Sequence, residues 1–455
     1  MSKTKLHETW SSKTIFLLAT VGAAVGLGSL WRFPFITGEN GGGAFVLLYI
    51  CFILLLGLPV AMIELAMGRI GKLSPLGTIS KLVTEGQHSR FWKLIGVLSL
   101  VIPYIAMTYY SVIASWSFGY FLKSASGQLH GITTAQANSI FSDFLASPLQ
   151  MLACFTAYIA VVVFVIGRGV RAGLEKASSF LMPALFLLLL GLVFYASIYG
   201  DFKASLNFLF KPDFSKATAS TFLLALGQAL FSLGIGVGAL MTYGAYLSKD
   251  VSLPRSAGIV AISVMFVSLL AGFAIFPFVF SFGLSPGEGP GLIFVTLPLA
   301  FGKLQFGTVI GAAFFILLAF AALTSSFAML EPVVSYLEER MNWHRMKLAA
   351  SAGLVAWAIG IVPLLSFNVW KDVKPLSFTA LYGEKNIFES FDFVVANLLL
   401  PLNSVLIALF AGWALNKLYL HDELRLSPAK MAYISFVAKI GAPLAIAVIF
   451  ISKFM

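Results

Sequence analysis

Charged residues are scarce in this chain of 455 residues: they make up 11% of it, whereas an ordinary soluble domain carries about 25%. Hydrophobic residues make up 59%, and 43 residues are Phe. A water-soluble core of that size is implausible, and a lipid bilayer supplies the missing apolar surroundings. The scarcity of charge therefore excludes a large soluble catalytic domain. It predicts an all-α polytopic membrane protein, because helices satisfy their own backbone groups in lipid.

Cysteine and histidine are also rare, with two and five residues respectively. Cys51 and Cys154 both lie inside apolar runs, which favours packed thiols over a disulfide or a metal pair. The His residues are scattered along the chain. Together these residues offer no nucleophile or metal cluster at one depth, so we do not expect an enzyme.

Long apolar runs are abundant, and about 20 apolar residues in a row indicate a transmembrane helix. Eleven runs qualify, near residues 14–37, 42–69, 92–123, 149–167, 178–199, 218–246, 257–283, 306–338, 348–368, 389–416 and 430–452. The apolar stretch 287–302 is shorter and opens with Gly and Pro, which predicts a re-entrant or capping loop. We expect residues 1–455 to form a single transmembrane domain.

The net charge of +11 reflects topology rather than nucleic-acid binding. Most Lys residues, and every Arg except Arg32, fall in the connections on the N-terminal side of the predicted membrane. Cytoplasmic loops carry such an excess of Lys and Arg. The N-terminus is therefore predicted to be cytoplasmic and, with an odd number of spans, the C-terminus outside. No nucleic-acid partner is expected.

The first and sixth spans are unusually rich in glycine. The glycines are Gly22, Gly26 and Gly28 in the first, and Gly234, Gly236 and Gly238 in the sixth. Each costs a helix about 1 kcal/mol relative to Ala. Tight helix packing through small residues is one interpretation. Paired breaks in corresponding positions of two halves favour another: a transporter site in which freed backbone groups bind substrate and ions.

Polar groups inside the spans are few, and such groups are costly and usually functional. Arg32 and Asp392 lie near the outer ends of two spans, either as a pair closing a vestibule or as two separate charges. Glu64 and Glu331 are predicted to be structural carboxylates bonded to backbone. Hydroxyls at 324–326 either bond their own helix or supply hard oxygen ligands for an alkali cation.

The stretch VGAAVGLGSLWRFPFITGENGGGAF resembles the first-helix signature of the neurotransmitter:sodium symporter family. Further matches are IPYIAMTYYSVIASW, GQALFSLGIGVGALMTYGAY and FAALTSSFAMLEPVVSYLEER. The resemblance covers essentially the whole chain and implies the leucine-transporter-type fold of the bacterial amino-acid transporter branch. That fold has inverted five-helix repeats, here about 13–200 and 217–417, and an eleventh peripheral helix at about 430–452.

The resemblance implies one well-preserved sodium site. Its residues would be Gly22, Val25, Ala321, Thr324 and Ser325. A second, doubtful sodium site would consist of Ala24, Ser29 and Ser232, of which Ala24 and Ser232 are the typical partners that remain. In that site Ser29 replaces a family Asn, and Val264 replaces an Asn or Asp. We therefore expect the second site to be absent or weak, with coupling to one sodium.

Chloride is a separate question that the resemblance raises. Tyr49, Gln228, Ser232 and Ser268 match the residues of chloride-dependent relatives. The carboxylate of chloride-independent relatives is missing from 257–283. Two hypotheses follow: chloride binds here, or no anion is needed because one cation has gone. Charge balance slightly favours the second.

The implied substrate pocket lies between the two broken spans. Its residues would be Ala23, Ala24, Gly26, Ala106, Tyr110, Phe231, Ser232, Gly234, Val237, Ser325 and Met329. Tyr110 matches a Tyr that holds a substrate carboxylate, and Gly26 stands where monoamine transporters carry an Asp. The resemblance thus implies an amino acid, and the small apolar wall favours a hydrophobic or aromatic one.

Gates complete the implied mechanism. Arg32 and Asp392 match the outer pair, whereas Trp10 and Glu339 match inner residues, and His7 stands where an Arg is expected. In the fifth span, Gly173 and Pro183 match a spacing at which unwinding opens a path to the preserved sodium site.

The predicted function is a sodium-coupled symporter that imports an amino acid by alternating access through a bacterial inner membrane. Proton coupling, or a single-sodium carrier of another small zwitterion, is the main alternative. A non-transporting sensor on the same fold is a further one. The sequence assigns no oligomeric state.

Overall fold

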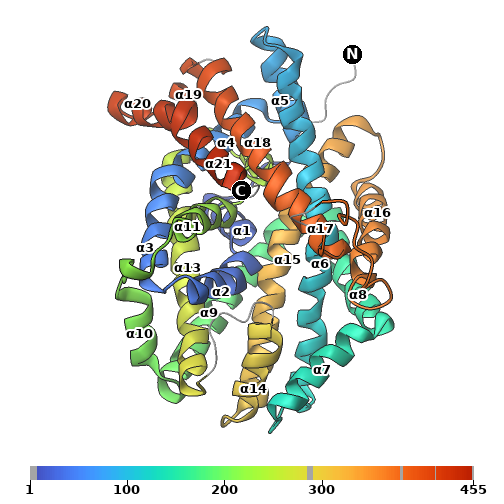
Figure 1. The fold of residues 1–455 in the computed structure, drawn as a ribbon. Helices are drawn as coiled ribbons and strands as arrows, with labels where there is room; N and C mark the ends of the chain where they lie inside the picture. The colour runs from blue at the N-terminus through green and yellow to red at the C-terminus, as the bar shows by residue number, and fades with distance from the viewer. Residues whose placement is uncertain (1–7, 284–290, 380–382, 416, 453–455) are drawn as a thin grey trace.

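The computed structural model describes residues 8–283, 291–379, 383–415 and 417–452, and all regular secondary structure within these ranges is helical. Long helices run side by side through the molecule (Figure 1), with α7, α10 and α14 at one end and α5, α19 and α20 at the other. The prediction of an all-α architecture is confirmed.

Each of the eleven apolar runs corresponds to one helix or to a set of helices that continue one another. In chain order these are α1 (Lys13–Ala24), η1 (Gly28–Arg32) and α2 (Phe33–Glu39); α3 (Gly43–Phe52), η2 (Ile53–Gly57) and α4 (Leu58–Gly71); η3 (Arg90–Trp92) and α6 (Lys93–Ala125); α8 (Pro148–Gly167); η4 (Val170–Glu175) and α9 (Lys176–Tyr199); α11 (Ala219–Ser232) and α12 (Ala239–Ala245); α13 (Leu253–Ser281); α15 (Gly307–Arg340); α16 (Arg345–Leu365); α17 (Ile387–Asp392), η7 (Phe393–Leu399), α18 (Leu400–Leu409) and η8 (Phe410–Ala414); α20 (Pro428–Phe436), η9 (Val437–Gly441) and α21 (Ala442–Ser452).

Length and hydropathy agree with this count. Nine helices in the described residues are long and apolar enough to cross a membrane, and the bent first span makes a tenth. The remaining run is the sixth along the chain, which α11 and α12 divide into two short pieces. Both glycine-rich runs are therefore broken helices rather than merely tightly packed ones.

The first span breaks after Ala24. Ser12 caps α1 by accepting a hydrogen bond from the backbone N–H of Ile15 at 3.2 Å. Val25 then leaves the helical region, with φ −85° and ψ 77°. The helix resumes at Gly28, and its two parts are bent by 54°. Backbone groups between the two parts are thereby released from the helical ladder.

In the sixth span, the break requires glycine for its backbone conformation. Gly234, Gly236 and Gly238 have φ angles of 66°, 81° and 83°. A residue with a Cβ adopts this region only at a steric cost, whereas Gly enters it freely. The three glycines thus turn the chain between α11 and α12.

The two breaks are held by helices from both halves of the chain. Long α6 and α15 pack against each other, α1 packs against α15 and α9, and α12 packs against α4. The residues of α6 and α15 that meet the first break are therefore the ones to examine for a site.

Shorter helices connect the spans. They are α5 (Pro75–Glu85), α7 (Thr134–Ala146), α10 (Phe202–Phe210), η5 (Phe214–Lys216), η6 (Leu292–Thr296), α14 (Leu297–Gly302) and α19 (Lys417–Leu424). Side-chain caps begin several of them, such as Ser74 for α5 and the Thr133 capping box of α7. Within the predicted loop 287–302, the described part forms η6 and α14, too short for a span, and 284–290 lie outside the described residues.

Candidate functional site

A cavity of about 310 Å³ lies between α6, the two broken spans, α15 and the start of the tenth span. Five residues of the predicted pocket line it: Ala106, Tyr110, Phe231, Val237 and Met329. The wall is largely aliphatic and aromatic, with a few polar groups. Such a cavity suits a small molecule that is apolar on one side and polar on the other.

The polar end of the cavity lies at the first break. The Tyr110 hydroxyl accepts a hydrogen bond from the backbone N–H of Leu27 at 3.3 Å. A Cβ placed on Gly26 would come within 3.1 Å of that hydroxyl and 3.2 Å of the Ser325 Cβ. Gly26 therefore leaves the space in which a substrate group can approach both Tyr110 and the exposed backbone.

The other predicted pocket residues surround this point less directly. Ser325 donates its hydroxyl to the carbonyl of Ala23 at 3.1 Å, and Ala24 is half-buried at the end of α1. Gly234 would meet nothing within 4 Å if it carried a Cβ. Ser232 points into a separate polar cluster, described below.

Sequence reasoning missed several cavity residues. On α6 these are Ile102, Tyr109 and Ile113, which share a helical face with Ala106 and Tyr110 because they are three or four positions apart. That periodicity was a usable signal. Phe388 and Leu400 also line the cavity, but no spacing in the sequence links the tenth span to the first.

Arg32 and Asp392 lie on the wall of this same cavity. The Arg32 guanidinium carbon is 4.5 Å from the centre of the Phe231 ring, within the range of a cation–π contact. Asp392 interacts electrostatically with Arg32 and with Tyr109. Asp392 is solvent-exposed and Arg32 is half-buried. The structure therefore brings the predicted outer pair together above the pocket.

Three of the predicted sodium residues, Gly22, Thr324 and Ser325, lie where α1 meets α15. A Cβ on Gly22 would lie 3.1 Å from the Thr324 Cβ, so the end of α1 and the hydroxyl helix are in close contact. Thr324 donates to the carbonyl of Ala321 at 3.0 Å. Val25, just past the end of α1, is fully buried. Carbonyl and hydroxyl oxygens gathered without a charged residue suit a monovalent cation.

The predicted chloride residues also meet, and the amide donors of Gln228 are engaged. Tyr49 and Ser268 share a hydrogen bond of 3.1 Å between their hydroxyls. Gln228 donates its amide to the Gly28 carbonyl at 2.9 Å and to Ser232 at 3.1 Å. The amide nitrogen has only two hydrogens to give. An anion that binds the Gln228 amide would have to displace one of its two hydrogen bonds.

For the doubtful second sodium site, Ser29 is fully buried, and its hydroxyl has no hydrogen-bond partner. Val264 is also fully buried and offers no side-chain oxygen. Ser232 accepts the Gln228 amide. Of the predicted set, Ser29 thus has the oxygen that is free to take a further partner.

At the other end of the first span, Trp10 packs between Phe16 of α1 and Tyr243 of α12. It is 7% exposed, and its indole N–H donates to the carbonyl of Tyr243 at 3.1 Å. Its backbone N–H donates to the carbonyl of Tyr246, also at 3.1 Å. The chain before α1 is thereby fixed to α12.

The inner carboxylates correct one expectation. Glu339 accepts from the backbone N–H and hydroxyl of Ser74, at 2.5 and 2.7 Å; its predicted neighbour His7 lies outside the described residues. The prediction that Glu331 is hydrogen-bonded to backbone is wrong. It is fully buried and pairs with Arg345 at 2.5 Å, while Tyr246 donates to it at 2.7 Å. A guanidinium 14 positions away was available to compensate the buried charge.

Glu64, in contrast, matches the expectation. Its carboxylate is fully buried and accepts a hydrogen bond from the backbone N–H of Gly236 at 2.7 Å. It thereby satisfies one of the backbone groups that the break in the sixth span frees.

The start of the fifth span is irregular, and the chain before α1 forms hydrogen bonds with it. Gly173 lies in the π-helical η4, and Pro183 lies inside α9. Glu8 accepts from the backbone N–H groups of Val170 and Arg171, at 2.9 and 3.0 Å. In return Glu175 accepts from Ser11, at 2.6 Å from its N–H and 2.7 Å from its hydroxyl. Sequence reasoning missed this reciprocal arrangement, which no motif marks.

Comparisons with known proteins agree with this architecture. The model of the sodium:neurotransmitter symporter family matches residues 7–142 and 139–455. A sodium-dependent transporter of Bacillus subtilis, YhdH, is 38% identical over 97% of each chain. One of Haemophilus influenzae is 33% identical over 99% of this chain and 98% of its own.

A solved structure shares the fold as well as the sequence. It is MhsT in complex with L-phenylalanine, 38% identical, with a TM-score of 0.89 over 98% of this chain and 100% of that chain. The predicted leucine-transporter-type fold is thereby confirmed. The chain is a multi-pass membrane protein that belongs to the sodium:neurotransmitter symporter family.

Proposed function

We propose that this protein imports an amino acid with a hydrophobic or aromatic side chain, driven by sodium. One observation carries the proposal: the first break lies between Tyr110 on α6 and the hydroxyls of α15, beside an apolar cavity. A carboxylate fits the Tyr110 hydroxyl and the freed N–H groups, because helix N-termini attract anions. The complex of MhsT with L-phenylalanine supports the same substrate class.

The proposed sodium ion binds the oxygens of Gly22, Val25, Ala321, Thr324 and Ser325. Ser325 lies at both sites, since its hydroxyl reaches the Ala23 carbonyl beside the pocket. Ion and substrate would then favour the same conformations, and a gradient of one drives transport of the other. The sodium-dependent transporters among the relatives support this coupling.

A single coupled sodium and no required chloride complete the proposal. Val264 removes one ligand of a second sodium site, and Ser29 stands in place of another. The Gln228 donors are already used within the protein, which weakens the case for an anion. Equal uptake in chloride and gluconate media is expected, whereas dependence on chloride would reverse this part of the proposal.

In the proposed mechanism, a bundle of spans 1, 2, 6 and 7 rocks and opens the site to one side of the membrane at a time. The two inverted repeats are residues 13–200 and 217–417, and a peripheral helix follows at 430–452. Arg32 and Asp392 close the outer side, and Trp10 and Glu339 close the inner side. The unwinding of the fifth span at Gly173 and Pro183 opens the ion path. The N-terminus lies in the cytoplasm and the C-terminus outside a bacterial plasma membrane.

Two experiments test the function. In a thermal-shift screen of the twenty amino acids, the substrate should raise the melting temperature more in Na⁺ than in K⁺, because only ligands that bind the folded state stabilise it. Uptake into proteoliposomes then separates the rival coupling ions. A sodium gradient without a pH gradient should drive uptake; uptake driven by a pH gradient alone would establish the proton-coupled alternative.

A further inference from the structure

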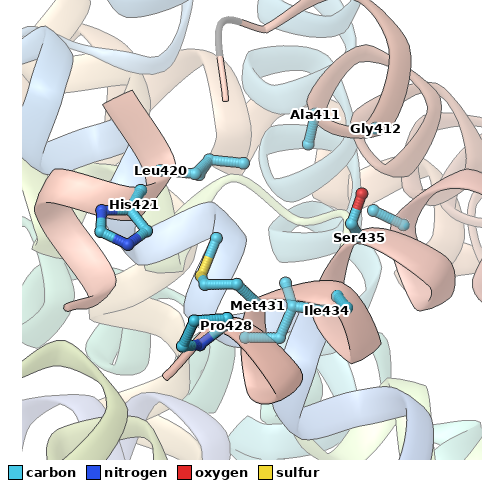
Figure 2. Close-up of a pocket in the computed structure, with 10 residues that line it drawn as sticks. Ala411, Gly412, Leu420, His421, Pro428, Met431, Ile434 and Ser435 are labelled. Atoms are coloured by element: carbon cyan, nitrogen blue, oxygen red, sulfur yellow. The ribbon is translucent and has the colours of Figure 1, made fainter. Parts of the chain in front are cut away.

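A second cavity lies away from the transport path, near the end of the molecule that holds α5 and α19. It has a volume of about 380 Å³ and is bounded by η8, α19, α20 and η9. Figure 2 shows Leu420 and His421 of α19 facing Met431, Ile434 and Ser435 across the hollow. These are the connection between the tenth and eleventh spans and the start of the eleventh.

The chemistry of the cavity is two-sided. Most of its wall is aliphatic, from residues such as Leu420, Met431 and Ile434, whereas His421 and Ser435 supply polar atoms. On the eleventh span, Tyr433, Phe436 and Ile440 are exposed, as expected of a helix that faces lipid. The cavity thus adjoins a surface in contact with acyl chains.

Basic residues lie close along the chain to the residues that line this cavity. Arg425 and Lys430 are exposed on either side of the turn into α20. Lys439 extends over the Trp413 ring at 5.2 Å, as a Lys does when its stem lies along apolar surface. Of the nearby acids, Glu423 is paired with Arg69 and Asp422 is exposed. The local excess is positive.

One wall of the cavity is also connected to the transport machinery. Arg69, at the end of α4, forms an ion pair with Glu423 of α19 and donates to its carbonyl at 2.9 Å. It also donates to the carbonyl of Val251, in the connection between α12 and α13, at 2.5 Å. The position of α19 is therefore fixed relative to the second and sixth spans.

We propose that this cavity binds one anionic phospholipid from the leaflet on the side of α19, with an acyl chain against the aliphatic wall and the headgroup phosphate among His421, Arg425 and Lys430. Basic pockets between membrane helices bind such headgroups. Bound lipid holds α19 in place and, through Arg69, stabilises the arrangement of α4 and α12. This inference does not depend on which substrate or coupling ion the protein uses.

Native mass spectrometry of the purified full chain tests the site directly. With mixed dioleoyl phosphatidylglycerol and dioleoyl phosphatidylcholine, the protein should retain one phosphatidylglycerol molecule in preference. Replacing Arg425→Ala or Lys430→Ala should weaken that preference about fivefold each, from about 1 kcal/mol per basic residue. Ser435→Trp, which fills the cavity, should abolish it.

Lys371→Ala is the matched control, because Lys371 is an exposed basic residue that follows the C-terminal end of α16 and does not line the cavity. Equal retention of the two lipids, or an equal loss in the Lys371→Ala protein, would overturn the proposal. The proposal would also be overturned if the protein retained no lipid selectively and formed a dimer that Ser435→Trp dissociates. The occupant of the cavity would then be a second copy of the chain. If Ser435→Trp fails to fold, the two Ala variants still decide the question.

Discussion

The two sides of the central cavity are closed by very different means. On the side of Arg32, the closing residues line an open cavity of about 310 Å³, and Asp392 is solvent-exposed. On the side of Trp10, hydrogen bonds and a buried ion pair join residues that are almost inaccessible to solvent. In this structure the side of Trp10 is the more tightly packed and hydrogen-bonded of the two.

The difference has a physical basis in solvation. Exposed ion pairs contribute at most about 1 kcal/mol, because water screens them. Removing one partner of a buried pair costs about 3–5 kcal/mol, because the remaining charge has no compensation. We therefore expect the contact between Arg32 and Asp392 to break at little cost, and the contacts on the side of Trp10 to break only with a larger event, such as ion or substrate binding.

The largest expected effect comes from Arg345→Met, which leaves Glu331 buried without its ion-pair partner. The closed arrangement on the side of Trp10 should lose about 3–5 kcal/mol of free energy. Hydrogen exchange should accelerate in residues 8–24, and uptake should fall by more than about tenfold. The double variant Glu331→Leu/Arg345→Met should recover part of the closure, because apolar pairs often replace buried ion pairs.

Arg340→Met is the control for this prediction, because Arg340 is exposed on the same helix end as Glu338 and Glu339. Its effect should stay within about 0.5 kcal/mol. Unchanged exchange in Arg345→Met would show that the ion pair does not hold the inner side closed.

The next effect is on the cavity between the two sides. Tyr110→Phe removes a hydroxyl that we expect to bind a carboxylate, and a hydrogen bond to a charged group contributes about 1.5–3 kcal/mol. The dissociation constant of the substrate should rise about 10- to 100-fold, measured by isothermal titration in Na⁺. Tyr109→Phe, on the same helix and in the same cavity, should raise the dissociation constant less. A larger rise in Tyr109→Phe than in Tyr110→Phe would place the substrate carboxylate nearer Asp392.

A smaller effect is expected at the reciprocal contact of Glu8 with the fifth span. Glu8→Gln replaces charge-assisted hydrogen bonds with neutral ones, which are about half as strong. Hydrogen exchange at residues 168–176 should accelerate several-fold, with little change in global stability. Glu39→Gln, an exposed acid on the outer side, is the control. Equal acceleration in both proteins would show that Glu8 does not restrain η4.

The smallest effect should follow Asp392→Asn on the outer side. Because Asp392 is exposed, its interaction with Arg32 should contribute at most about 1 kcal/mol. Uptake should then change by less than about fivefold, and the melting temperature should hardly move. A loss as large as that of Arg345→Met would mean that both sides are closed equally strongly.

Predictions from the sequence were accurate where one type of residue determines the local structure. The glycines at 234, 236 and 238 predicted a break that their positive φ angles explain. The apolar runs each correspond to a helix or a set of helices, and up to ten of these are long and apolar enough to cross a membrane within the described residues, since lipid permits few other structures. The contact between Gly22 and Thr324 was accessible only through the resemblance to a known family.

Pairings between distant parts of the chain were not predictable in this way. Glu331 looked like an isolated carboxylate because Arg345 belongs to the next span, and nothing in a single sequence pairs the two. The contacts of Glu8 and Ser11 with η4 are separated by more than 160 residues. Such contacts depend on how the spans pack, which hydrophobic periodicity does not specify.

In the proposed function, the first break binds an amino acid and a sodium ion together. Binding of labelled L-phenylalanine to the purified protein, measured in Na⁺ and in K⁺, tests it most directly. The native protein should bind much more tightly in Na⁺, and the Thr324→Ala/Ser325→Ala variant should lose that difference. A variant that keeps the full sodium dependence would contradict the account.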